Sequence, residues 1–242
     1  MDKTMQKSQT KKSDSEIKPT LIKSKKRVAD HGEVFTPSNI VNDMLDLVKN
    51  ETERIDSRFL EPACGNGNFL VEILRRKLAV VKSRYKASQM EWERNAIVAV
   101  CSCYGVDILS DNVAECRERL ATGFEQEYKA IFKTKIREQV VAVAKFVLSK
   151  NIICGDALTM KQQDGNPIVF AEWSAVNHIK VKRRDFELAN LLETEQYYAK
   201  ISDKQDSMFS LFREKGVDLI LPKAVGDYPV INFDEIHSMG DK

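Results

Sequence analysis

The stretch Arg58–Leu70, RFLEPACGNGNFL, decides how this chain folds. Its apolar beginning is typical of a short strand over residues 58–60, and the turn residues after it predict a tight loop over residues 61–68. From Phe69 onward the apolar residues follow helical spacing. A strand, a glycine-containing loop and a helix in this order indicate the first unit of an α/β domain with a parallel sheet.

Two further strands are predicted along the chain. CYGVDIL predicts a strand that ends at Asp107, and NIICGDA predicts a strand that ends at Asp156. Residues 90–101 and 110–148 have helical patterns between them, so strands and helices alternate.

Another helix is predicted upstream, in FTPSNIVNDMLDLV. Thr36 has the residue type of an N-cap, and Pro37 suits the first helical position. The spacing of the apolar residues places one group on a single helix face: Ile40, Val41, Met44, Leu45 and Val48.

An acidic residue stands at the end of each predicted strand: Glu61, Asp107 and Asp156. In open α/β sheets, ligands bind at the carboxyl ends of the strands. These three carboxylates are therefore expected to face one ligand site.

The loop between the first strand and its helix contains Gly65 and Gly67. Glycines there let a ligand approach the backbone closely. The dinucleotide fingerprint G-x-G-x-x-G is not present, because Leu70 occupies the third glycine position. Asp107 also lies 42 residues after Gly65, where roughly 20 is usual in dinucleotide folds, which predicts a two-helix excursion between them.

FLEPACGNGNFL resembles the methionine-binding loop of S-adenosylmethionine-dependent methyltransferases, above all the N6-adenine group of bacterial restriction–modification enzymes. GEVFTP resembles the preceding segment that closes over the methionine end, which Phe35 and Thr36 would line. YGVDIL resembles the second motif of these enzymes, and GDAL the third. The resemblance covers roughly residues 28–160 and implies a Rossmann-like class I methyltransferase sheet with S-adenosylmethionine as its cofactor.

The resemblance also implies roles for single residues. Glu61 would accept hydrogen bonds from the cofactor ammonium group, and Asp107 would accept from both ribose hydroxyls. Ile108 would pack on the adenine face, while Asp156 and the Ala157 backbone would bind the adenine edge. The complete predicted cofactor site is Phe35, Thr36, Glu61, Pro62, Ala63, Cys64, Gly65, Gly67, Asn68, Asp107, Ile108, Asp156 and Ala157.

The family's catalytic motif, Asn/Asp-Pro-Pro-Tyr/Phe at the end of a fourth strand, has no counterpart here. Its polar oxygen accepts from the target amino group, and its ring stacks on the flipped base. Asn166-Pro167 follows polar residues and Asp-Gly, so it is predicted to be a turn. VDLILPKAV has the shape of the fourth strand, but it lacks the Asn/Asp and the ring. No catalytic residue is therefore predicted.

Residues 161–242 are predicted to form a C-terminal extension. PIVFAEW and HIKVKRRDF alternate and are expected to pair as a hairpin around Val176-Asn177, followed by a mostly helical segment and a possible short strand in VDLIL. The basic residues of the hairpin would contact a partner or DNA phosphate, with a solvated hairpin as the alternative. They are Lys180, Lys182, Arg183 and Arg184.

Composition adds few constraints. The chain has 242 residues and a net charge of +2, and no apolar run approaches the roughly 18 residues of a membrane span. Residues 1–27 contain nine lysine or arginine residues against three acidic ones, which predicts a disordered basic tail, either solvated or in contact with nucleic acid. The five cysteines are expected to be reduced and buried in a cytoplasmic protein, and no metal site is predicted.

Three functions remain compatible with these features. The first, which we favour, is the S-adenosylmethionine-binding subunit of a split DNA methyltransferase, inactive alone and completed by a second subunit that carries Asn-Pro-Pro-Tyr and recognises DNA. The sheet would then be truncated and covered by that partner. The second is a non-catalytic regulatory protein with the same fold. The third is a self-sufficient methyltransferase acting on a substrate other than DNA.

Overall fold

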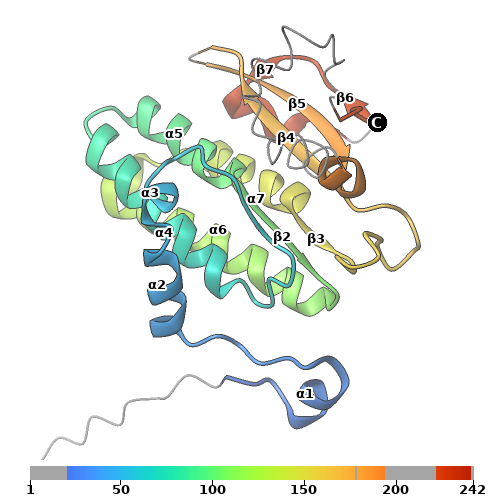
Figure 1. Ribbon diagram of the computed structural model, residues 1–242. Coiled ribbons are helices and arrows are strands. Elements are labelled where there is room, and N and C mark those ends of the chain that lie inside the picture. The colour runs from blue at the N-terminus through green and yellow to red at the C-terminus, as the bar shows by residue number, and fades with distance from the viewer. Residues whose placement is uncertain (1–20, 178, 194–221, 241–242) are drawn as a thin grey trace, which may run out of the picture.

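The computed structural model describes residues 21–177, 179–193 and 222–240. Within them, helices and a three-stranded parallel sheet form an α/β domain, and a four-stranded antiparallel sheet follows it (Figure 1). The elements are α1 (Lys25–His31), α2 (Ser38–Asp46), α3 (Lys49–Thr52), β1 (Phe59–Glu61), α4 (Asn68–Tyr85), α5 (Gln89–Cys101), β2 (Cys103–Asp107), α6 (Ser110–Phe132), η1 (Lys133–Lys135), α7 (Glu138–Asn151), β3 (Ile152–Cys154), β4 (Val169–Ala175), β5 (Lys180–Glu187), β6 (Gly226–Asp227), β7 (Ile231–Asn232) and η2 (Phe233–Ser238).

The parallel sheet has the order β1-β2-β3. Each strand lies beside the one before it, and right-handed crossovers in one direction place the connecting helices on one face of the sheet. Helices α4, α5, α6 and α7 pack against one another there, as Figure 1 shows. The two-helix excursion predicted before β2 is α4 and α5.

The C-terminal hairpin contacts the opposite face of the sheet at β2. Alternation along β2 directs Tyr104 and Val106 away from the helices. They pack with Ile168 and Phe170 in a separate apolar cluster, and the Tyr104 hydroxyl donates a hydrogen bond to the Ala171 carbonyl at 3.0 Å. The hairpin is therefore part of the same folded unit as the sheet.

The predicted hairpin is confirmed. Strands β4 and β5 pair antiparallel from Val169–Glu187 to Ala175–Val181, and β6 and β7 both add to β5. Strand β4 of the hairpin also packs on α7, where the Trp173 indole N–H donates to the Asn151 side-chain oxygen at 3.0 Å.

Several predicted element boundaries were wrong. The first strand covers Phe59–Glu61 rather than residues 58–60, and the helix after the loop begins at Asn68 rather than Phe69. The third strand ends at Cys154 rather than Asp156, because the Asp156 backbone turns to bond with Lys161. Helix α2 begins at Ser38 with Pro37 as the N-cap residue and no side-chain cap, so Thr36 is not the N-cap.

The apolar face predicted for α2 is only partly buried. Val41 and Leu45 pack into the core, whereas Ile40, Met44 and Val48 are 42, 51 and 44% exposed. The helix therefore presents an apolar strip to its surroundings.

The prediction of a disordered tail was wrong for residues 21–27, which the structure describes as part of the domain. Residues 24–31 form a short capped helix: Ser24 accepts a hydrogen bond from the Arg27 N–H. Lys23 and Arg27 form ion pairs with α6, and these contacts hold residues 21–27 on the domain. Residues 1–20 lie outside the described residues.

Asn166-Pro167 is a turn, as predicted. Gly165 has φ +83, the Gly165 N–H donates to the Gln162 carbonyl, and the Asn166 side chain donates to Asp164. The predicted strand VDLIL and most of the helical segment before it lie outside the described residues.

All five cysteines are free thiols, and four of them are buried. The helices of the described ranges include none that is long and apolar enough to cross a membrane.

Gly67 allows the start of α4 to pack closely on α6. It has φ +88, and a Cβ at this position would lie 2.6 Å from the Cys116 Sγ. Both the backbone conformation and the space therefore require glycine.

We predict that Gly67→Ala lowers the free energy of unfolding by about 2 kcal/mol or more, through backbone strain and overlap with Cys116. Gly123→Ala is the matched control, because Gly123 lies inside α6 with nothing within 4 Å of its Cβ position. The control should gain up to about 1 kcal/mol from helix propensity. Urea unfolding followed by circular dichroism compares the two, and equal stability for both variants would contradict the packing role.

Candidate cofactor-binding site

A cavity of about 640 Å³ opens at the carboxyl ends of β1, β2 and β3. Every residue of the predicted cofactor site lines it except Gly67, which instead serves the packing of α4 on α6. The three strand-end acids therefore meet at one site, as their positions predicted. Residues 31–36 form the side of the cavity that belongs to the N-terminal segment.

Asp107 connects the glycine loop to the end of β2. Its Oδ2 accepts the Gly65 N–H at 2.9 Å, and its Oδ1 accepts the Leu109 N–H at 2.9 Å and the Asn112 amide at 3.2 Å. A carboxylate has about four acceptor positions, so roughly one remains, on Oδ2. Asp107 can thus accept one further hydrogen bond from a ligand, rather than the full pair expected from the resemblance.

Glu61 lies half-buried at the end of β1, where it lines the cavity. Burial raises the pKa of its carboxyl above the ordinary value, and a hydrogen bond from the Ala63 backbone offsets this only in part. A desolvated carboxylate of this kind gains most when a cation approaches it. This environment suits a ligand ammonium group.

Gly65 forms the closest contact between the loop and the N-terminal segment. It has φ +52, and a Cβ here would lie 3.3 Å from the Phe35 ring. Beside it, the Asn68 side chain donates to the Thr36 carbonyl at 2.9 Å. The loop and residues 35–36 thus form one continuous wall, at the end where the resemblance placed the methionine moiety.

The other end of the cavity is formed by the residues after β2 and β3. Ile108 is 48% exposed there, near Asp156 and Ala157. The Asp156 Oδ1 accepts the Leu158 N–H at 2.8 Å. An exposed aliphatic side chain beside a carboxylate offers a flat ring both an apolar face contact and an edge hydrogen bond.

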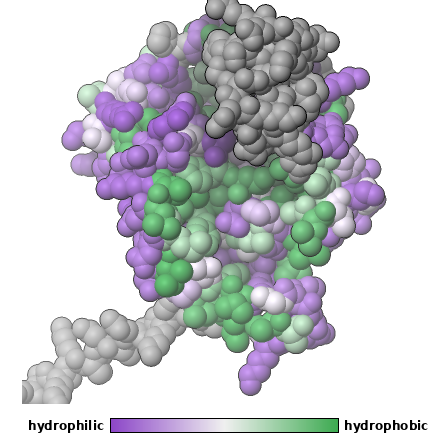
Figure 2. Space-filling view, viewed as in Figure 1, coloured by the Kyte–Doolittle hydropathy of each residue, from purple (hydrophilic) through white to green (hydrophobic). Residues whose placement is uncertain are grey.

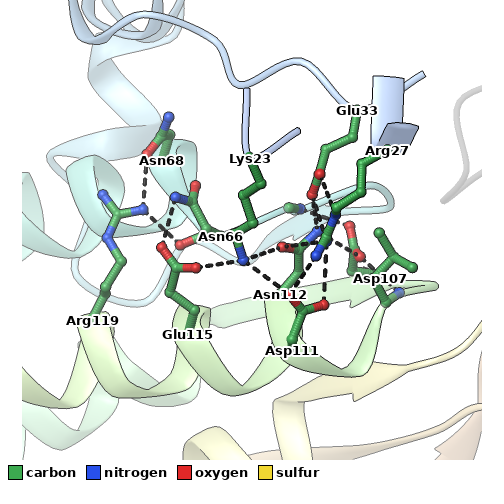
Figure 3. Close-up of polar contacts among 12 residues, drawn as sticks. Lys23, Arg27, Glu33, Asn66, Asn68, Asp107, Asp111, Asn112, Glu115 and Arg119 are labelled. Atoms are coloured by element: carbon green, nitrogen blue, oxygen red, sulfur yellow. Dashed lines mark hydrogen bonds and ion pairs between the residues drawn. The ribbon is translucent and has the colours of Figure 1, made fainter. Parts of the chain in front are cut away.

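Helix α6 holds the glycine loop through polar side chains on one face (Figure 3). Glu115 accepts from the Asn66 amide at 2.9 Å. Arg119 donates to the Asn66 carbonyl at 2.7 Å and to the Asn68 Oδ1 at 2.8 Å. The loop conformation therefore depends on α6 as well as on its own glycines.

Cys64 lies in the loop but is not suited to nucleophilic chemistry. A hydrogen bond with Cys116 and burial both raise the pKa of its thiol far above the ordinary value. Only the thiolate is an effective nucleophile, so this thiol is structural.

Several cavity residues were not predicted, above all Glu33, Asn66 and Asn112. Asn66 lies in the predicted loop and Glu33 lies in GEVFTP, but the resemblance assigned no role to either residue. Asn112, Glu115 and Arg119 recur at three- and four-residue spacing on one face of α6. This repeat of polar residues on one helix face is the sequence pattern from which their shared role could have been predicted.

The cavity thus lies where open α/β sheets bind their ligands, outside the carboxyl ends of the strands. Residues 21–108 match the family model described as N-6 DNA Methylase. This match supports the resemblance seen in the motifs: over residues 21–108 the chain is similar to the N6-adenine DNA methyltransferases. Searches of the curated proteins and of the solved structures found no match. Enzymes of this family generally use S-adenosylmethionine.

We predict that the affinity for S-adenosylmethionine falls as the pH decreases from about 7.5 to about 5. The pKa of Glu61 is raised in the free protein, and a bound ammonium group would lower it, so binding becomes weaker once Glu61 is protonated. Glu61→Gln should bind more weakly at pH 7.5 and lose most of this dependence. Calorimetric titrations of both proteins across the pH range measure the effect. Identical pH profiles would contradict the role of Glu61.

We also predict that Asp107→Ala abolishes cofactor binding, because it removes a ligand acceptor and releases the Gly65 and Leu109 N–H groups. Asn166→Ala should bind like the wild type, since Asn166 lies in the turn and bonds only locally with Asp164 and Gln162. Equilibrium binding of labelled S-adenosylmethionine compares the two variants. Lost binding in Asn166→Ala would mean that this pair belongs to the site after all.

Proposed function

We propose that this chain is the S-adenosylmethionine-binding subunit of a split N6-adenine DNA methyltransferase of a restriction–modification or antiphage system. Its parallel strands would be the cofactor half of a Rossmann-like class I sheet. A second polypeptide would supply Asn-Pro-Pro-Tyr and target recognition. The observation that carries the proposal is a cavity that gathers the family's cofactor residues in a chain whose sequence has no acceptor motif.

The residues of the cavity fit the proposed cofactor in their chemistry. A desolvated carboxylate at Glu61 suits an ammonium group, Asp107 has one acceptor position left for a hydroxyl, and Ile108 offers an apolar surface. When bound, S-adenosylmethionine supplies the methyl group. The part of this chain is then to bind and orient it, since positioning contributes most of the catalysis in a direct transfer between two held groups.

The exposed edge of β1 supports the need for a partner. In the described part of the chain, β1 pairs only with β2. In a parallel pair, the N–H and C=O of one residue both point toward the neighbouring strand, and those of the next residue both point away from it. Phe59 donates its N–H to Ser102, on the β2 side, so the Leu60 backbone points to the open edge. A partner strand could pair there, beside the cavity.

Apolar surface lies on both sides of this edge. On one side, Met44, Val48 and Leu60 line a cavity of about 220 Å³ between α2 and β1. On the other, Leu60 and Phe170 line a cavity of about 510 Å³ next to the hairpin. Figure 2 shows hydrophobic side chains gathered over α2 and the β1 edge. Apolar patches of this kind are typical of surfaces that another chain covers.

The basic hairpin can contribute less to DNA binding than its sequence suggested. Arg183 is 2% exposed, bonds with Asp185 and lies over the Tyr228 ring, so it cannot reach a phosphate. The prediction that Arg183 contacts a partner or DNA is therefore wrong, because its side chain is used in packing within the protein. Arg184 pairs with Glu172 and Lys182 with Asp227, both nearer the surface. Within this cluster, contact with DNA or a partner is proposed for Lys180, Lys182 and Arg184 only.

We predict that the chain alone methylates no adenine in DNA, and that activity requires the co-purified product of a neighbouring gene carrying Asn-Pro-Pro-Tyr. Met44→Glu/Leu47→Glu should reduce that activity about 100-fold by placing charge in the apolar interface, without changing cofactor binding. Leu47 is 87% exposed, so folding should tolerate the change.

Met90→Glu is the control, because Met90 is also exposed, at 56%, but lies on α5 away from β1. Transfer of labelled methyl groups to mixed DNA gives the readout. Activity of the chain alone would mean that this chain contains the catalytic residues itself, and would overturn the split-enzyme proposal. Cofactor binding without activity, even with the neighbour present, would favour a regulatory protein.

A further inference from the structure

The N-terminal segment, residues 21–36, is held on the domain mainly by polar contacts. Helix α1 buries none of its residues. The Lys23 ammonium contacts Asp111 at 3.2 Å and Glu115 at 2.7 Å on α6, and Arg27 also pairs with Asp111. Arg27 holds the pKa of Asp111 down at about 2, so this carboxylate stays ionised throughout the neutral range. The segment is thus attached by charge rather than by apolar burial.

Asn112, at the start of α6, is at the centre of these contacts (Figure 3). It is 1% exposed. Its amide nitrogen donates to Glu33 at 2.7 Å and to Asp107 at 3.2 Å. Its oxygen accepts from Lys23 at 2.9 Å and from Arg27 at 3.1 Å. The amide therefore uses both of its donors and both of its acceptor positions.

The charges around Asn112 fix the orientation of its amide. The nitrogen faces two carboxylates and the oxygen faces two cations, so the reversed amide would place like partners together. The neutral Asn112 amide lies between the Glu33 and Asp107 carboxylates. It donates a hydrogen bond to each, which offsets the repulsion between their negative charges. A buried amide whose donors and acceptors are all used is held in one geometry.

Asn112 thereby connects the two sides of the cavity. Asp107 holds the glycine loop through Gly65, and Glu33 belongs to the segment that carries Phe35. The Phe35 N–H donates to the Leu21 carbonyl at 2.8 Å, and its ring packs over Gly65. A displacement of Asn112 would therefore move the acceptor at Asp107 and the wall at Phe35 together.

We propose that Asn112 is a positioning residue of the cofactor site, which orients Asp107 and holds residues 21–36 closed over the methionine end. This inference rests on the proposed function, since it presupposes that the cavity takes S-adenosylmethionine. Because charged groups make the closing contacts, closure weakens as ionic strength rises. Asn112 would not touch the reacting atoms.

The test compares Asn112→Leu and Asn112→Asp with the wild type and with Asn166→Leu, a change in a turn residue that does not line the cavity. Asn112→Asp keeps the shape and the cation contacts but replaces both donors with negative charge. Hydrogen exchange without ligand is measured first. Both Asn112 variants should lose protection in residues 21–36 and in the loop over residues 62–67, while Asn166→Leu should not.

Affinity is measured next with S-adenosylmethionine and with 5′-methylthioadenosine, which lacks the amino-acid part. The Asn112 variants should bind both ligands about tenfold to 100-fold more weakly, because the Asp107 side and the wall are both displaced. Lys23→Gln/Arg27→Gln should lose affinity mainly for S-adenosylmethionine. That double variant should also lose the decline in affinity that the wild type shows between about 50 and 500 mM salt.

Two different failures can be told apart. A wild type that binds neither ligand would overturn the proposed function and this inference with it. A wild type that binds S-adenosylmethionine, with Asn112 variants that match it in affinity and in hydrogen exchange, would overturn the inference alone. Loss of thermal stability without any change in affinity would likewise contradict a positioning role.

Discussion

The hydrogen bonds accepted by the Asp107 carboxylate join the parts of the molecule on which the cavity depends. They tie the loop after β1, through the Gly65 N–H, to the start of the segment after β2, through the Leu109 N–H. Gly65 can take its left-handed conformation there because no side chain has to fit under the Phe35 ring. A carboxylate at this strand end therefore has a structural task before any ligand arrives.

The cavity is assembled from elements that are far apart in the sequence and are held by α6. One face of this helix carries the polar side chains that bind the loop, at Glu115 and Arg119, and those that bind the N-terminal segment, at Asp111 and Asn112. The neighbouring face packs into the apolar core through residues such as Cys116 and Leu120. Placement of the ligand site is thus coupled to the same packing that stabilises the domain.

Much of the fold and the site could be predicted because the signals were local. Strand-end acids and a glycine loop follow each other along the chain, and the carboxyl ends of parallel strands meet at one edge. The role of Gly67 was misjudged, because its neighbour Cys116 comes from a helix that begins more than forty residues later. Lys23 and Arg27 looked like free cations because their partners Asp111 and Glu115 lie on α6, more than eighty residues later. Arg183 has a partner close in sequence, Asp185, but the Tyr228 ring over its guanidinium group is distant in sequence.

Every role proposed for these residues presupposes that the cavity at the ends of β1, β2 and β3 binds S-adenosylmethionine. The measurement to make is a calorimetric titration of the purified chain with this cofactor, beside the same titration of Gly65→Trp. We expect one saturable site in the wild type and none in the variant, whose new side chain would meet the Phe35 ring. No heat of binding in the folded wild type, or equal binding in both proteins, would mean that this cavity is not the cofactor site.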